Sequence, residues 1–205
     1  MSKSFLEFVE KKQKEEGDTL TSRITLGDGN DYKPFTISDD PNSEHYGKNR
    51  HLAPLVRAFK KGANWGWSRD DKSGEDKPVK TGGKKLFLTG GALRDHLAGK
   101  TPRNMELATN ASPDETRRIL LQNGFRQTEG DVAVPHQNTF FVQDTDLRGR
   151  PVKFGVRVGD SQFELSMFAK GRKEPGSHED DASGRDFTIN AMYLALTNDN
   201  GPNKE

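Results

Sequence analysis

The stretch KKLFLTGGALRDHLAGKTPRNMELAT, residues 84–109, constrains the fold more than any other part of the chain. Its first six residues predict a strand, and residues 92–98 predict a short helix that ends at Gly99. The NMELAT segment, residues 104–109, predicts a second strand. A glycine pair between a strand and a helix lets backbone N–H groups approach phosphate oxygens, because no Cβ lies in the way. The stretch therefore predicts a strand–turn–helix unit that can bind phosphate.

A well-marked helix follows the second strand. Ser112 is the expected N-cap, Pro113 suits the first helical position and Glu115 completes a capping box. Gly124 is the expected end of this helix. Two strands and two helices within residues 84–124 favour an α/β or an α+β core.

Apolar and polar residues alternate again farther along the chain. Residues 136–169 alternate between turn residues and predict a β-hairpin or meander. Residues 184–196, GRDFTINAMYLAL, predict a closing helix with Asp186 near its start. Together with the preceding elements, these segments lead us to expect an α+β fold with a mixed central sheet flanked by helices.

The N-terminal part of the chain has a different character. We expect residues 1–83 to form an irregular extension and residues 84–205 to form a second domain that is truncated at its C-terminal side. Within the extension, the sequence predicts an amphipathic helix carrying Phe5, Phe8 and Val9, short strands at 22–26 and 34–37, a helix at 51–62, and a Gly-, Lys- and Asp-rich linker at 63–83.

Composition excludes several classes of site. The chain has no cysteine, which excludes disulfides, cysteine-containing zinc sites and thiol catalysis. Its net charge is +1, so any contact with nucleic acid must use a local patch; between Lys84 and Arg126 there are eight basic and four acidic residues. No apolar run approaches the ~20 residues of a membrane span. We therefore expect a soluble, intracellular, cytoplasmic chain with no membrane partner.

Two blocks of sequence carry a more specific pattern. The residues LTGGALRDHLAGKTPRNMELATNASPDETRRIL and EDDASGRDFTINA resemble the head domain of the class II CCA-adding enzymes and bacterial poly(A) polymerases, within the DNA polymerase beta-like nucleotidyltransferase superfamily. That family has a Gly-Gly loop, an Arg-Asp pair, a strand with Asp-x-Asp, a second strand with a glutamate, and an Arg-Asp-Phe-Thr-Ile-Asn-Ala segment. The resemblance covers about residues 85–196.

The resemblance implies a function for particular residues. It implies that an RNA 3′ end, of tRNA or of a poly(A) tail, reacts with ATP or CTP, with Mg²⁺ as cofactor. The positions that match the family's carboxylates are Asn104, Glu106 and Glu164, of which Glu106 and Glu164 are the expected metal ligands. The positions that match its nucleotide-binding residues are Gly90, Gly91, Arg94, Asp95, Arg185, Asp186 and Asn190.

The sequence departs from the family at the residues that are most sensitive for catalysis. Asn104 and Glu106 replace the Asp-x-Asp pair. Asparagine offers a neutral oxygen where Mg²⁺ prefers an anionic one, and glutamate carries its carboxylate one methylene farther out. Two hypotheses follow. The chain is an RNA nucleotidyltransferase with weakened or lost transfer, or it is a pseudoenzyme that serves as a nucleotide- or RNA-binding or structural module in a larger assembly, with the N-terminal extension contacting a protein partner.

Overall fold

The computed structural model describes most of the chain between residues 13 and 197. The described residues are 13–16, 19–25, 31–44, 46–47, 49–69, 74–80, 84–100, 102, 105–170, 174–175, 178–184 and 192–197.

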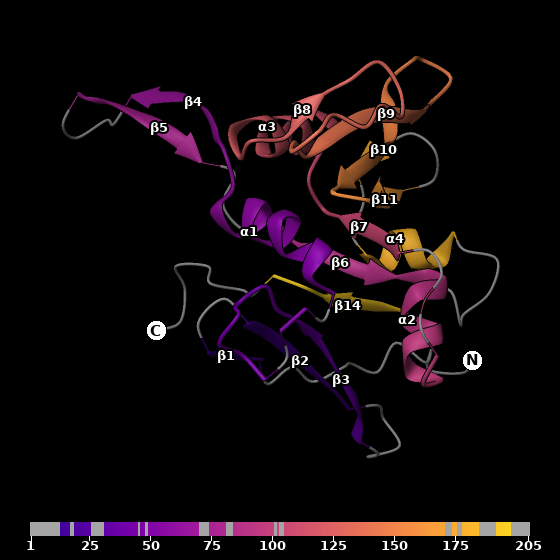
Figure 1. Ribbon diagram of the computed structural model, residues 1–205. Helices are drawn as coiled ribbons and strands as arrows, with labels where there is room; N and C mark the ends of the chain where they lie inside the picture. The colour runs from indigo at the N-terminus through magenta and orange to yellow at the C-terminus, as the bar shows by residue number, and fades with distance from the viewer. Residues whose placement is uncertain are drawn as a thin grey trace.

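A seven-stranded mixed sheet forms the centre of the fold (Figure 1). Its strand order is β14-β6-β7-β11-β10-β9-β8. The pairs β7–β11 and β8–β9 are parallel, and the other neighbours are antiparallel. The expected α+β fold with a mixed sheet is confirmed. The strands are β6 (Leu86–Thr89), β7 (Met105–Thr109), β8 (Arg126–Gln127), β9 (Thr139–Thr145), β10 (Pro151–Val158), β11 (Ser161–Met167) and β14 (Tyr193–Ala195).

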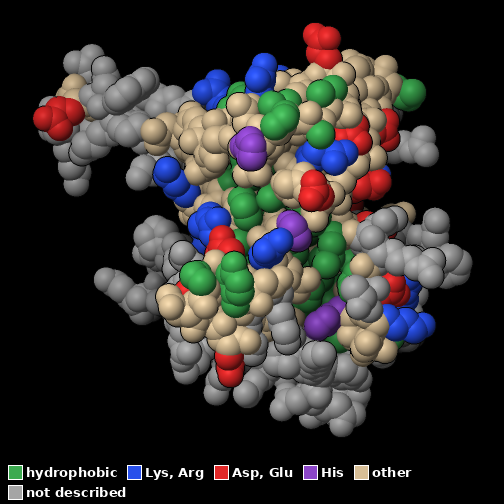
Figure 2. All heavy atoms as spheres, in the orientation of Figure 1, with side chains coloured by type: hydrophobic (Ala, Val, Ile, Leu, Met, Phe, Trp, Pro, Cys, Tyr) green, Lys and Arg blue, Asp and Glu red, His purple; other side chains and the backbone are tan. Residues whose placement is uncertain are grey.

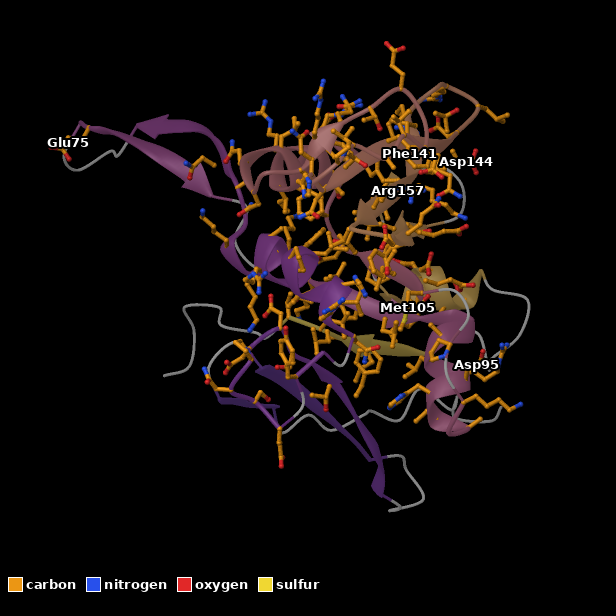
Figure 3. The ribbon with its side chains drawn as sticks, viewed as in Figure 1. Glu75, Asp95, Met105, Phe141, Asp144 and Arg157 are labelled. Atoms are coloured by element: carbon orange, nitrogen blue, oxygen red, sulfur yellow. The ribbon has the colours of Figure 1, made fainter. Side chains whose placement is uncertain are left out.

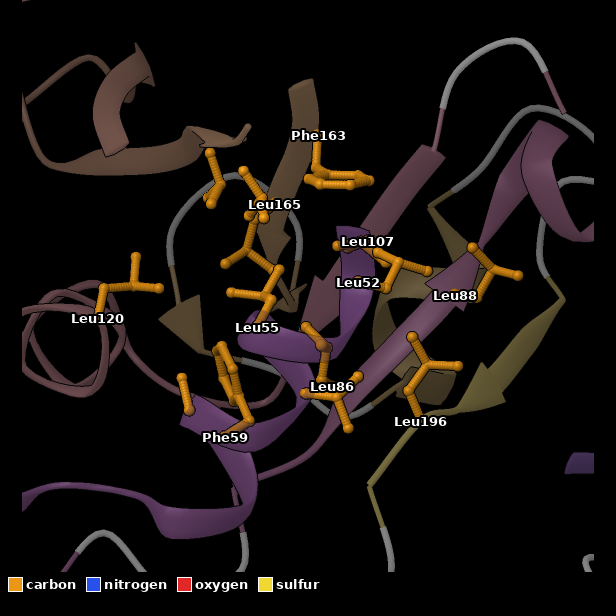
Figure 4. Close-up of a cluster of buried hydrophobic side chains, with 14 of the residues drawn as sticks. Leu52, Leu55, Phe59, Leu86, Leu88, Leu107, Leu120, Phe163, Leu165 and Leu196 are labelled. Atoms are coloured by element: carbon orange, nitrogen blue, oxygen red, sulfur yellow. The ribbon is translucent and has the colours of Figure 1, made fainter. Parts of the chain in front are cut away.

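One face of this sheet is covered by helices and forms the main core. Side chains of a strand alternate between its two faces, so Phe154 and Val156 of β10 point to the same face. Both are fully buried under the helices. Figure 4 shows Leu55 and Phe59 packed with Leu86 of the sheet. The helices are α1 (Ala53–Lys61), preceded by the 3-10 turn η1 (Arg50–Leu52), α2 (Gly90–Leu97), α3 (Pro113–Gln122) and α4 (His178–Ser183).

The other face of the sheet is more open. Near β14 it carries a small apolar cluster of Phe87, Ala108 and Phe168, with Tyr193 packed against it. The Tyr193 hydroxyl donates a hydrogen bond to the carboxylate of Asp181 in α4. This hydrogen bond joins α4 to β14 next to the small cluster.

Helix α3 has the predicted termini. The Ser112 hydroxyl accepts a hydrogen bond from the Glu115 backbone N–H at 3.3 Å, and the Glu115 carboxylate accepts one from the Ser112 N–H at 2.8 Å. Asn123 caps the other end, followed by Gly124 with a φ of 85°. Local sequence therefore suffices to set this helix, because the capping groups lie within it.

Part of the N-terminal zone packs onto the same core. Strands β1 (Gln13–Glu16), β2 (Thr19–Thr25) and β3 (Asp31–Ile37) form a three-stranded antiparallel sheet. Phe35 and Ile37 of β3 are buried in the cluster that also contains α1 and the central sheet. The expected division after residue 83 stays a prediction. The expected helix around Phe5 lies outside the described residues.

Two segments differ from the sequence-based expectation. The expected linker at 63–83 contains a hairpin of β4 (Asn64–Arg69) and β5 (Asp76–Lys80), which extends away from the central sheet in Figure 1. Backbone pairing in a hairpin does not require alternating apolar side chains, so the sequence of residues 63–83 gives no strong strand signal. The expected closing helix at 184–196 is wrong at Tyr193–Ala195, which is strand β14 paired with β6. A short apolar segment does not distinguish helix from strand, and here the sheet edge decides.

Two further short strands, β12 (Ala169–Lys170) and β13 (Glu174–Pro175), pair with each other between β11 and α4. No helix in the described part of the chain is long and apolar enough to cross a membrane.

Candidate active site

Two carboxylates lie side by side on the open face of the sheet. Glu106 of β7 and Glu164 of β11 are direct partners in the parallel ladder. Their neighbours Leu107 and Leu165 are buried on the opposite, helix-covered face, so both glutamates belong to the open face. Neighbouring strands lie about 4.8 Å apart, so the two side chains are close enough to contact one ligand.

Glu164 is held by two side chains, one from the adjacent strand β10 and one from β9 beyond it. The Lys153 ammonium donates to Oε2 at 2.9 Å, and the Gln143 amide donates to Oε1 at 3.2 Å. The hydrogen bond from Lys153 lowers the pKa of Glu164 from its ordinary value of 4.5, against the opposing effect of partial burial. The Glu106 carboxylate has no hydrogen bond or ion pair to any residue that the structure describes. The two carboxylates are therefore in different electrostatic surroundings.

The glycine pair begins α2 directly beside these carboxylates. Thr89, the last residue of β6, is the ladder partner of Glu106 in the antiparallel pair. Its hydroxyl donates to the backbone carbonyl of Met192 at 3.0 Å, which joins the end of β6 to the segment before β14. Gly90 then turns the chain with a φ of 61°, in the left-handed region that favours glycine. The unpaired N–H groups of the first turn of α2 are consequently next to the carboxylate pair.

Arg94 folds back along the first turn of α2. Its Nε and Nη2 atoms both donate to Oδ1 of Asp95, at 3.1 and 3.0 Å. A Cβ added to Gly91 would lie 3.2 Å from Nη2, so the guanidinium lies against the Gly91 backbone. Figure 3 shows Asp95 at α2 and Met105 at the start of β7. Asp95 thus orients a cation near the positive end of the α2 dipole, where an anion would bind.

Gly155 and Phe141 line the site on its other side. Gly155 of β10 is the ladder partner of both Glu164 and Phe141. A Cβ at Gly155 would lie 2.2 Å from Cζ of Phe141, which means that the tip of the ring occupies the space over the glycine. The absent side chain at Gly155 therefore provides the space that the ring of Phe141 fills next to Glu164.

The structure brings together six of the residues expected from the sequence, and four lie outside its description. The six are Gly90, Gly91, Arg94, Asp95, Glu106 and Glu164. The four are Asn104, Arg185, Asp186 and Asn190.

Sequence reasoning missed Lys153 and Gln143. Alternation along β10 puts Lys153 on the face opposite Phe154, which is a readable signal. It does not reveal that β10 lies beside β11, which brings the ammonium to Glu164.

The carboxylate pair has the chemistry of a partial Mg²⁺ site. No group of three or more His, Cys, Asp or Glu residues that could hold a metal ion occurs in the described ranges. Mg²⁺ is usually held by one or two carboxylates together with substrate phosphates and water, rather than by a protein-only cage. Glu106 and Glu164 supply two hard, anionic oxygen ligands from adjacent strands, so they fit a cation that is bound together with a phosphate group.

On the face drawn in Figure 2, basic side chains lie among acidic and hydrophobic ones rather than in one continuous patch. The side chains coloured on this face therefore give no broad positive field that would attract nucleic acid.

Comparison with known proteins identifies relatives of this arrangement. Residues 86–201, more than half of the chain, match the family described as Poly A polymerase head domain. Poly(A) polymerase I of Salmonella typhimurium is 31% identical over 129 residues, covering 56% of this chain and 24% of the relative. The CC-adding tRNA nucleotidyltransferase of Halalkalibacterium halodurans is 29% identical over 117 residues, covering 57% and 24%. The chain thus spans about a quarter of the length of these relatives.

Among solved structures, the Bacillus stearothermophilus CCA-adding enzyme in complex with CTP matches with a TM-score of 0.42 and 22% identity, covering 71% of this chain and 28% of that chain.

Proposed function

This chain belongs to the Poly A polymerase head-domain family, and on that premise we propose that it binds a nucleoside triphosphate and an RNA 3′ end at the Glu106–Glu164 face of the sheet, with nucleotide transfer weakened at Asn104 and Glu106. One observation carries the proposal. The two glutamates are ladder partners, and the turn that begins α2 lies directly beside them. A phosphate site and a pair of carboxylates next to each other are what phosphoryl transfer between nucleotides requires.

The triphosphate contacts the first turn of α2. Its negative charge is favoured by the backbone N–H groups after Gly90 and Gly91 and by the helix dipole. The Arg94 guanidinium, held by Asp95, adds a charge-assisted hydrogen bond to a phosphate oxygen. Residues Arg185, Asp186 and Asn190 contribute to the nucleotide pocket by their match to the family.

Glu106 and Glu164 would hold Mg²⁺, with the Asn104 side-chain oxygen as a neutral third ligand. The bound metal would supply positive charge that stabilises the phosphate oxygens as the bond to pyrophosphate breaks. Transfer is weakened because Asn104 has lost one negative charge and Glu106 carries its carboxylate one methylene farther out than an aspartate. A misplacement of about 1 Å can lower the rate by about 10²-fold.

Calorimetric titration of ATP and of CTP into the purified chain, first with Mg²⁺ and then with EDTA, tests the proposal. We expect binding that weakens when EDTA removes the metal and that weakens in a Glu106→Gln variant. Glu129→Gln is the matched control, since Glu129 is an exposed carboxylate in the loop after β8, at the edge of the sheet beyond β10 and β9. Extension of a labelled RNA 3′ end then measures transfer directly. If neither nucleotide binds under any condition, the nucleotide-site proposal is wrong.

A second candidate function is a catalytically inactive nucleotide- or RNA-binding module, or a structural module of a larger assembly. The ion pair of Glu164 with Lys153 favours it, because this carboxylate is already neutralised within the chain. Nucleotide binding that is indifferent to EDTA, without RNA extension, would support the binding module. The absence of any nucleotide binding would leave the structural role.

A further inference from the structure

We propose that Lys153 competes with the divalent cation for Glu164, so that the metal affinity of the site is set by a lysine of the chain itself. This inference rests on the proposed function, because it concerns the same carboxylate pair. It adds a residue that is absent from the family pattern described above and that sequence reasoning missed.

The geometry of the three strands supports competition. β11 lies between β7 and β10, so Glu106 and Lys153 approach Glu164 from opposite sides. Lys153 is the ladder partner of Ser166, two residues beyond Glu164, and its long side chain reaches diagonally to Oε2 at 2.9 Å. A metal shared by the two glutamates would lie toward β7. The lysine holds the Glu164 carboxylate toward β10, away from that position.

Gln143 acts in the same direction as Lys153. It belongs to β9, one strand beyond β10, and donates to the other oxygen of Glu164 at 3.2 Å. Both carboxylate oxygens of Glu164 thus accept hydrogen bonds from the side away from Glu106. To share a cation with Glu106, the Glu164 carboxylate must weaken or release these contacts.

Of the two cationic residues of β10, Lys153 is the one that is paired with Glu164. Arg157, four residues farther along β10, is engaged with Asp131 at 2.7 Å and so is turned to a different carboxylate. The Lys153 and Glu164 side chains are 32% and 44% exposed, so their ion pair is accessible to solvent and can open. A divalent cation on Glu164 would also be repelled by an ammonium group on the same carboxylate. The ion pair and the bound metal therefore oppose each other.

Titration of Mn²⁺ followed by electron paramagnetic resonance tests the inference on the full chain. Mn²⁺ stands in for Mg²⁺, because carboxylate and water ligands suit both ions. We expect Lys153→Met and Lys153→Gln to bind Mn²⁺ about fivefold more tightly than the parent, because an exposed ion pair contributes up to about 1 kcal/mol. Lys153→Arg keeps the charge and is expected to stay within about twofold of the parent.

Two controls separate competition from a general charge effect. Lys61→Met makes the same change in net charge on α1, which packs on the opposite face of the sheet, and is expected to leave the affinity unchanged. In a Glu164→Gln background, Lys153→Met is expected to have no further effect, because the shared partner is gone. Thermal unfolding of each variant confirms that it is folded at the titration temperature.

The outcomes distinguish this inference from the proposed function. If the parent binds Mn²⁺ and Glu106→Gln loses it, but both neutral Lys153 variants match the parent, then competition is wrong and the metal site stands. If neither the parent nor the neutral Lys153 variants bind Mn²⁺, both proposals are wrong, because removing a competitor should have uncovered the site.

Discussion

Glu106 and Glu164 are direct partners in the ladder of β7 and β11, yet within the described residues only Glu164 has a cationic partner. The pair is therefore asymmetric. The Glu106 carboxylate has no partner among the described residues and can bind a ligand directly. The Glu164 carboxylate is already paired with the Lys153 ammonium. Variants that change either member should reveal this difference in metal binding.

Restoring the family's carboxylates should strengthen metal binding. We expect the Asn104→Asp/Glu106→Asp double variant to bind Mg²⁺ about tenfold more tightly than the parent, because it adds one negative charge to the donor set and shortens the second ligand. Calorimetry in the presence of ATP measures the affinity. Asn138→Asp adds the same charge in the loop before β9 and serves as the control. A double variant without any gain would show that the alignment of this strand is wrong.

A side chain at Gly155 should be destabilising. An added Cβ would lie 2.2 Å from the Phe141 ring, so Gly155→Ala must displace the ring or the strand, at a cost of about 1–3 kcal/mol. Urea unfolding measures the free energy. Because the clash involves Phe141 alone among the nearest atoms, Gly155→Ala combined with Phe141→Leu should be less destabilised than the sum of the two single variants. Simple additivity would contradict the packing of the ring over the glycine.

The two glycines at the start of α2 should respond differently to alanine. Gly90 has a φ of 61°, so Gly90→Ala should lower stability by about 1–2 kcal/mol. At Gly91 the nearest atom to a new Cβ is the flexible end of Arg94, at 3.2 Å, so Gly91→Ala should change stability by less than about 0.5 kcal/mol. Thermal unfolding of both variants compares them. Equal losses would mean that the turn does not depend on the left-handed conformation of Gly90.

The capping box of α3 should contribute a pH-dependent part of the stability. Burial raises the pKa of Glu115, but hydrogen bonds from Ser112 and Lys84 outweigh it and hold the pKa below its ordinary value of 4.5. A lowered carboxyl pKa stabilises the fold above pH 4.5, and this contribution is lost as the pH falls through the folded-state pKa. We expect Glu115→Gln to be about 0.5 kcal/mol less stable at pH 7 and equal to the parent in strong acid.

Chemical unfolding at a series of pH values measures this difference. Glu129→Gln is the control, because Glu129 is exposed in the loop after β8. A Glu115→Gln deficit that persists unchanged at low pH would show that the loss is not electrostatic.

Much of the fold could be predicted from local sequence. Helix α3 was predicted from Ser112, Pro113 and Glu115 because the groups that satisfy its first backbone N–H groups lie within four residues. The turn at Gly90 was predicted because a glycine pair between an apolar strand and a helix has few other uses. Strand β14 was not predicted, since its state depends on β6, more than one hundred residues earlier in the chain.

The candidate site, like the fold, could be predicted only in part from the sequence. The sequence by itself determined the residue types, namely the glycine pair, Arg94, and the carboxylates Glu106 and Glu164, and it determined the face of each strand through the period of two. Only the tertiary structure decided that Glu106 and Glu164 are ladder partners and that Lys153 reaches Glu164. Strand order and register arise from contacts between distant segments, and periodicity within one strand carries no information about its neighbour.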